Sequence, residues 1–107
     1  MDNTLEQQIA VWFLSHELAE TLQQALDFVR LVEKGEANDE MAAVLNKNMD
    51  IRSQLGGNVT TEAALKFLQE KRATAEKLIA MWEKNPKDTN AVFFFRNFKN
   101  QDWDNVK

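Results

Sequence analysis

His16, Glu17 and Glu20 are the residues whose types and spacing come closest to a metal-binding or catalytic motif. The stretch His16-Glu17-Leu18-Ala19-Glu20 has the first two positions of the zinc-helix pattern H-E-x-x-H, with glutamate in place of the second histidine. Side chains four residues apart share one face of a helix. His16 is the single histidine of the chain, however, and no other motif nominates a third ligand. We therefore expect no metal and no cofactor, and interpret His16 as a solvated or interfacial residue.

Other residue types that carry catalysis are scarce. The chain has no cysteine and no tyrosine, and Ser15 and Ser53 are its only serines. Neither serine stands in a nucleophile-elbow context. Gly56-Gly57 lacks the further glycines and the lysine of a phosphate-binding loop, so it indicates a turn. The sequence predicts no catalytic site and a protein that is not an enzyme.

Charge is divided unevenly along the chain, whose net charge is −4. Residues 1–50 contain ten acids and three bases, whereas residues 51–107 contain seven acids and ten bases. One interpretation is that helices of opposite charge attract each other within one bundle. The alternative is that the acidic half presents a surface to a basic partner. Nucleic-acid binding by the whole domain is disfavoured, because it requires a clustered excess of lysine and arginine.

The composition predicts helices with short connections, because the 107 residues include only three glycines and one proline. We expect one all-α domain over residues 1–107, built as a small antiparallel bundle of four helices. Capping residues and breakers, such as Thr4, Asn38 and Pro86, set the expected bounds. The helices are predicted at 4–34, 38–55, 61–84 and 89–99, the last being short and aromatic, with a frayed tail over 100–107.

The predicted helix over 4–34 carries two apolar faces in its first half. One stripe continues to Val32 at spacings of three and four residues and predicts the core face. A second group, Leu5, Ile9, Trp12 and Phe13, points roughly the opposite way and continues into polar residues such as His16 and Glu20. A helix that is apolar nearly all round is buried on both sides, either within its own domain or against another chain.

Four of the seven phenylalanines, Phe93, Phe94, Phe95 and Phe98, lie within six positions near the carboxyl end. A strand is the competing interpretation, but no partner strand is predicted elsewhere. Three consecutive side chains cannot all point one way on a helix, so at least one phenylalanine is exposed or meets a partner. Base stacking beside Arg96 and Lys99 is a weaker alternative.

Taken together, these features predict a non-enzymatic protein-binding module, such as an inhibitor, immunity or regulatory protein that acts by occupying the surface of another protein. The candidate partner-binding residues are Leu5, Ile9, Trp12, Phe13, His16, Glu20, Phe93, Phe94, Phe95, Arg96 and Phe98. A structural homodimer is the alternative, and a nucleic-acid-binding accessory protein the third possibility. We expect no membrane span, because no apolar run approaches about 20 residues. We also expect a cytoplasmic location.

Overall fold

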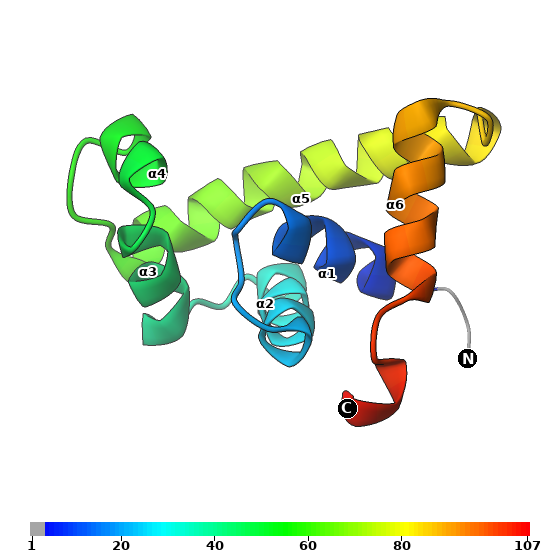
Figure 1. Ribbon diagram of the computed structural model, residues 1–107. Helices are drawn as coiled ribbons and strands as arrows, with labels where there is room; N and C mark the ends of the chain where they lie inside the picture. The colour runs from blue at the N-terminus through cyan, green and yellow to red at the C-terminus, as the bar shows by residue number, and fades with distance from the viewer. Residues whose placement is uncertain (1–3) are drawn as a thin grey trace.

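The computed structural model describes residues 4–107, and all regular secondary structure in this range is helical (Figure 1). The all-α class predicted from the sequence is confirmed. The division into four helices is wrong, because residues 4–107 contain six α-helices and one 3-10 helix. They are α1 (Leu5–Ser15), α2 (Leu22–Lys34), α3 (Asp39–Asn46), α4 (Met49–Gln54), α5 (Thr61–Lys84), α6 (Thr89–Lys99) and η1 (Trp103–Asn105).

Helices α5 and α6 have the predicted bounds, because each begins at a strong capping residue. The Thr60 hydroxyl accepts a hydrogen bond from the Ala63 backbone N–H at 3.1 Å, and the Asp88 carboxylate accepts one from the Asn90 N–H at 2.8 Å. Such bonds satisfy N–H groups that have no partner inside the first helical turn.

The predicted helix over 4–34 is interrupted between α1 and α2. Glu17 adopts a left-handed backbone conformation with φ of 60°, and no other non-glycine residue within 4–107 has a positive φ. The Leu18 N–H donates back to the Phe13 carbonyl at 2.9 Å, which closes α1 with a Schellman motif. Thr21 then caps α2. The chain therefore changes direction where an unbroken helix was expected.

Burial of the second apolar face explains this break. An unbroken helix would have carried α2 away from α1, whereas the turn lets α2 pack beside it. Ile9 and Phe13, which belong to the second face, and Val11, which belongs to the first, all have 0% of their surface exposed. Removing several large apolar side chains from water outweighs the helix propensity of the few residues in the turn.

The predicted helix over 38–55 is also broken, between α3 and α4. The Asn48 side-chain oxygen caps α4 by accepting from the Ile51 N–H at 3.2 Å. Just before it, the Asn46 side chain accepts from the Val59 N–H at 2.9 Å and donates to the Val59 carbonyl at 3.0 Å. Asn46 thus fixes the loop that leads into α5.

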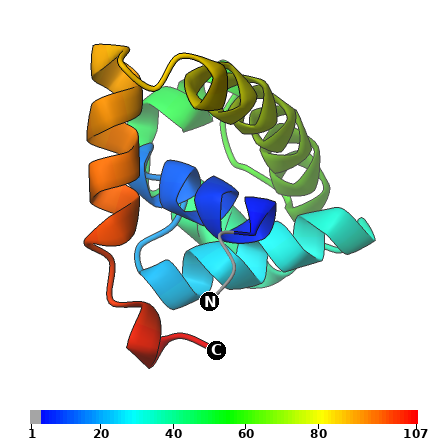
Figure 2. The same ribbon diagram turned by 90° about the vertical axis from the view of Figure 1, so that its right-hand side faces the viewer.

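Helix α1 lies at the centre and packs against α2, α5 and α6. Figure 2 shows α1 between α6 on one side, α5 above and α2 below. In Figure 1, α5 runs across the molecule, with α3 and α4 near its amino-terminal end and α6 at its carboxyl end. No helix within residues 4–107 is long and apolar enough to cross a bilayer.

The segment 100–107, for which fraying was expected, contains η1 and contacts two helices. The Trp103 indole N–H donates to the Phe98 carbonyl at 2.7 Å, and the two aromatic rings lie 4.9 Å apart. Arg30 of α2 donates to the Lys107 carbonyl at 3.0 Å. These contacts connect the end of the chain to α6 and α2.

Candidate functional site

The predicted partner-binding residues separate into buried and exposed groups. The buried side chains are Ile9, Trp12, Phe13, Phe94 and Phe98, with Phe95 half-buried; the exposed ones are Leu5, His16, Glu20, Phe93 and Arg96. Ile9 and Phe13 have no exposed surface to offer a partner. Any binding surface must therefore be built from the exposed residues and from buried side chains that line an open hollow.

One apolar groove brings together residues from both groups, where α1, α5 and α6 meet. It has a volume of about 530 Å³, within the range of about 300–1,000 Å³ typical of ligand pockets. Its lining residues are Trp12, Ser15, His16, Leu78, Trp82, Asn90, Phe93, Phe94 and Asn97. We call this hollow the α1–α5–α6 groove. It contains four of the predicted residues, two from the first helix and two from the phenylalanine segment.

The α6 side of the groove follows from helical periodicity. Asn90, Phe93, Phe94 and Asn97 are spaced three, one and three residues apart, so they share one face of α6. The Asn97 side-chain amide donates to the Ser15 hydroxyl at 3.2 Å and connects α6 to the end of α1. Along α6, the aromatic residues Phe93 and Phe94 lie between two asparagines, Asn90 and Asn97, and Asn97 contacts Ser15.

The α5 side of the groove was not predicted as part of a site. Leu78 and Trp82 are four residues apart on α5, and both are half-buried and line the groove. The Trp82 and Phe94 rings lie 5.0 Å apart in a tilted arrangement, within the range of favourable aromatic contacts. The signal in the sequence was the apolar stripe of the 61–84 helix, to which Leu78 and Trp82 belong.

His16 and Trp12 form a stacked pair at the α1 side of the groove. Their ring centroids are 3.9 Å apart with planes inclined by 19°, and His16 Nδ1 lies 3.0 Å from the Trp12 carbonyl oxygen. Trp12 is only 4% exposed, and its indole N–H has no hydrogen-bond partner within residues 4–107. Buried donors usually have an acceptor, so this N–H is a local defect of the folded chain.

A second, smaller hollow continues past the same pair. It has a volume of about 140 Å³, and its lining includes Trp12, His16, Asp50, Phe67 and Lys71. Trp12 and His16 line both hollows, and both hollows border α5, through Leu78 and Trp82 in the groove and through Phe67 and Lys71 in the smaller one. We call these two neighbouring hollows the α5 track. The smaller one carries the charged side chains of Asp50 and Lys71.

Phe93 is an exposed apolar side chain of the groove wall. Its side chain is 60% exposed, and the Arg96 guanidinium lies 5.7 Å from the centre of its ring. An exposed aromatic ring beside a preformed hollow is a common feature of binding surfaces. Phe93 also confirms the prediction that one of the three consecutive phenylalanines is exposed.

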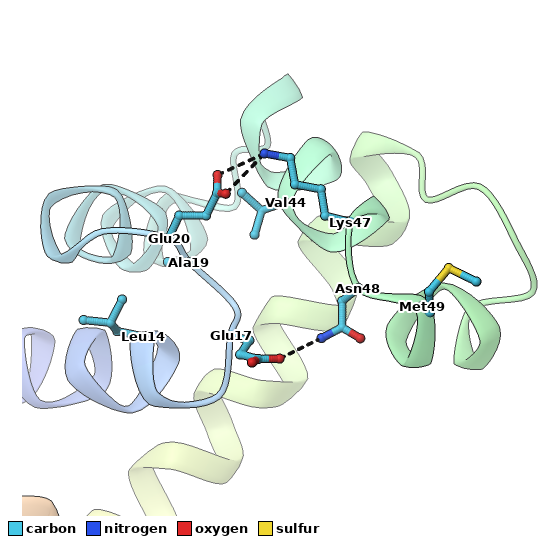
Figure 3. Close-up of a pocket in the computed structure, with 8 residues that line it drawn as sticks. All are labelled: Leu14, Glu17, Ala19, Glu20, Val44, Lys47, Asn48 and Met49. Atoms are coloured by element: carbon cyan, nitrogen blue, oxygen red, sulfur yellow. Dashed lines mark hydrogen bonds and ion pairs between the residues drawn. The ribbon is translucent and has the colours of Figure 1, made fainter.

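Glu20 lies in a different, polar hollow between the α1–α2 turn and α3–α4. Figure 3 shows its carboxylate pointing toward Lys47, at 3.2 Å, and Glu17 pointing toward the Asn48 amide, at 3.5 Å. Met49, 73% exposed, stands at the edge of this hollow. Both carboxylates already have partners here, so Glu20 does not belong to the α1–α5–α6 groove. Within residues 4–107, no group of three or more His, Cys, Asp or Glu side chains is arranged to hold a metal ion.

Comparison with known proteins adds no relative. No protein-family model, no curated protein and no solved structure matches the chain.

Proposed function

We propose that the protein is a non-enzymatic binding module, of the inhibitor, immunity or regulatory kind, that occupies the surface of another protein through the α1–α5–α6 groove. The observation that carries this proposal is Phe93. A 60% exposed aromatic ring at the wall of a 530 Å³ apolar groove is unfavourable in water. Burying it against a partner would stabilise the complex.

The composition of the groove also supports a protein partner. Tryptophan, phenylalanine and arginine are enriched where partners bury surface, and the groove combines Trp12, Trp82, Phe93 and Phe94 with Arg96 at the edge. Its rings are held by the core, since Phe94 packs on Trp82. A wall that is already ordered loses little entropy on binding.

Site-specific photo-cross-linking tests this proposal. A benzophenone side chain is placed at position 93 and, as the matched control, at Met49, which is also exposed but lies on α4. In extract of cells that express the protein, we expect covalent adducts with another protein from position 93 and none from position 49. Equal adducts from both positions, or none from position 93, would contradict the proposal.

The two alternatives predict different products. A structural homodimer gives a cross-link between two copies of this chain in the purified protein, with a doubled mass by sedimentation that Phe93→Glu halves. A nucleic-acid-binding protein gives nuclease-sensitive adducts. Either result would replace the proposed function.

A further inference from the structure

Two cations beside the groove have no acidic partner. The ion pairs within residues 4–107 use Arg30, Lys47 and Arg72, and none uses Lys71 or Arg96. Both free cations lie over aromatic rings instead: the Lys71 ammonium is 5.2 Å from the centre of the Phe67 ring, and Arg96 lies over Phe93. Lys71 lines the small hollow, and Arg96 stands next to the groove wall.

The surrounding segment has an excess of positive charge. Residues 71–99, which supply the α5 and α6 walls, contain seven bases and three acids, although the whole chain has a net charge of −4. Asp50 also lines the small hollow and offsets part of the charge of Lys71. Arg72, the neighbour of Lys71, is already paired with Glu33 and Glu76. The attraction of groups of opposite charge to the two hollows therefore falls to Lys71 and Arg96.

The shape of the site favours a helical ligand. Residues 4–107 contain no strand, so they offer no sheet edge to which an extended peptide could add. The track lies between helices and has an apolar centre, as in complexes where an amphipathic helix fills a groove. Lys71 and Trp82 are separated along α5 by about 16 Å, from the rise of 1.5 Å per residue. That length corresponds to three turns of a partner helix.

The same positive charge could attract nucleic acid, but the aromatic rings are poorly arranged for it. Base stacking needs ring faces open to solvent. Trp12 and Phe94 are buried, His16 covers Trp12, and Arg96 lies over the exposed ring of Phe93.

We infer that the groove binds an acidic amphipathic helix of another protein, with apolar side chains against Leu78, Trp82 and Phe93 and carboxylates facing Lys71 and Arg96. This inference rests on the proposed function and specifies the chemistry of its partner.

A displayed library of helix-forming peptides tests the partner chemistry directly. Each peptide has about 16 residues, enough for more than four turns, with one face apolar and the flanking positions randomised among Glu, Lys, Gln and Ser. Selection on the purified full chain should enrich peptides with a net negative flank. Affinities of the selected peptides are then measured by fluorescence anisotropy.

Four variants assign the binding to the groove. Arg96→Glu and Lys71→Glu, each alone, should weaken the selected acidic peptides by about tenfold. Lys66→Glu is the matched control, because this exposed lysine of α5 lines neither hollow and should leave affinity unchanged. Phe93→Glu should abolish enrichment.

Specific outcomes overturn the inference. Enriched peptides with neutral or basic flanks, or an equal effect of Arg96→Glu and Lys66→Glu, would reject an acidic partner helix. No enrichment on the wild-type chain would do the same. Retention of a labelled single-stranded oligonucleotide at low salt, lost in Arg96→Glu, would reassign the site to nucleic acid. If position 93 cross-links to a protein segment that is not acidic, the inference fails while the proposed function stands; if position 93 yields no adduct, the function fails.

Discussion

Replacing Glu17 with glycine should stabilise the folded protein. Glu17 has φ of 60° at the end of α1, a conformation that Gly35 adopts at the end of α2 with φ of 71°. The left-handed region costs a residue with a Cβ atom about 1–2 kcal/mol relative to glycine. The helix ends at positions 17, 35 and 56 share the hydrogen bonds of a Schellman motif. Of these three positions with positive φ, only position 17 is not glycine.

The size of the effect follows from two opposing contributions. Glycine removes the backbone strain but loses more conformational entropy on folding, about 0.5–1 kcal/mol. The side-chain contact that is lost is weak, since the Asn48 amide and the Glu17 carboxylate are 3.5 Å apart and exposed. We expect a net gain of about 0.5–1 kcal/mol in the free energy of unfolding, or about 2–8 °C in melting temperature.

Urea denaturation followed by far-UV circular dichroism measures this change, with Glu17→Ala as the matched control. Both variants remove the carboxylate, but only glycine removes the strain, so the difference between them isolates the backbone contribution. Gly35→Ala should show the reverse, a loss of about 0.5–1 kcal/mol, since a Cβ added there meets nothing within 4 Å and only φ opposes it. A Glu17→Gly variant no more stable than Glu17→Ala would refute the reasoning.

Four further substitutions test other parts of the fold by the same denaturation assay. Phe13→Ala should cost about 3–5 kcal/mol, because this ring is fully buried, whereas Phe93→Ala should change stability by less than about 0.5 kcal/mol; similar costs would contradict the assigned exposures. Asn46→Ala should cost about 2–3 kcal/mol, since it leaves the N–H and carbonyl of buried Val59 without their partners, and a neutral result would show that water replaces the side chain. Trp103→Ala should cost about 1–2 kcal/mol through loss of its ring contact and hydrogen bond to Phe98, and no loss would indicate that the tail does not contribute to stability.

The parts of the fold that were predictable are those determined by local signals. Thr60 and Asp88 begin α5 and α6, and Pro86 lies between the two helices, so the bounds 61–84 and 89–99 could be predicted from capping and breaking residues alone. Such residues act through backbone groups only a few positions away. No tertiary information was needed for these two helices.

The breaks within the other two predicted helices depend on tertiary packing, although a capping residue lies at each break in the sequence. Thr21 and Gln24 repeat the capping spacing of Thr4 and Gln7, and Thr21 does accept from the Gln24 N–H at 3.1 Å. Asn48 likewise is a capping residue within the predicted helix over 38–55, and it caps α4. A capping residue inside a continuous apolar pattern is ambiguous, because only the gain from burying both faces decides whether the helix ends there.

The groove itself could not have been predicted, because it depends on how three helices meet. The sequence left open whether the phenylalanine segment or another chain covers Leu5, Ile9, Trp12 and Phe13. In the structure Leu5 is 44% exposed, the other three side chains are buried within the chain, and α6 packs on α1. Covering that surface orients α6 so that Phe94 faces inward and Phe93, one position and about 100° away, remains in solvent beside Trp82. The apolar surface left for a partner is therefore a consequence of how α6 covers α1, and a substitution that alters the α1–α6 contact should change the groove as well as the core.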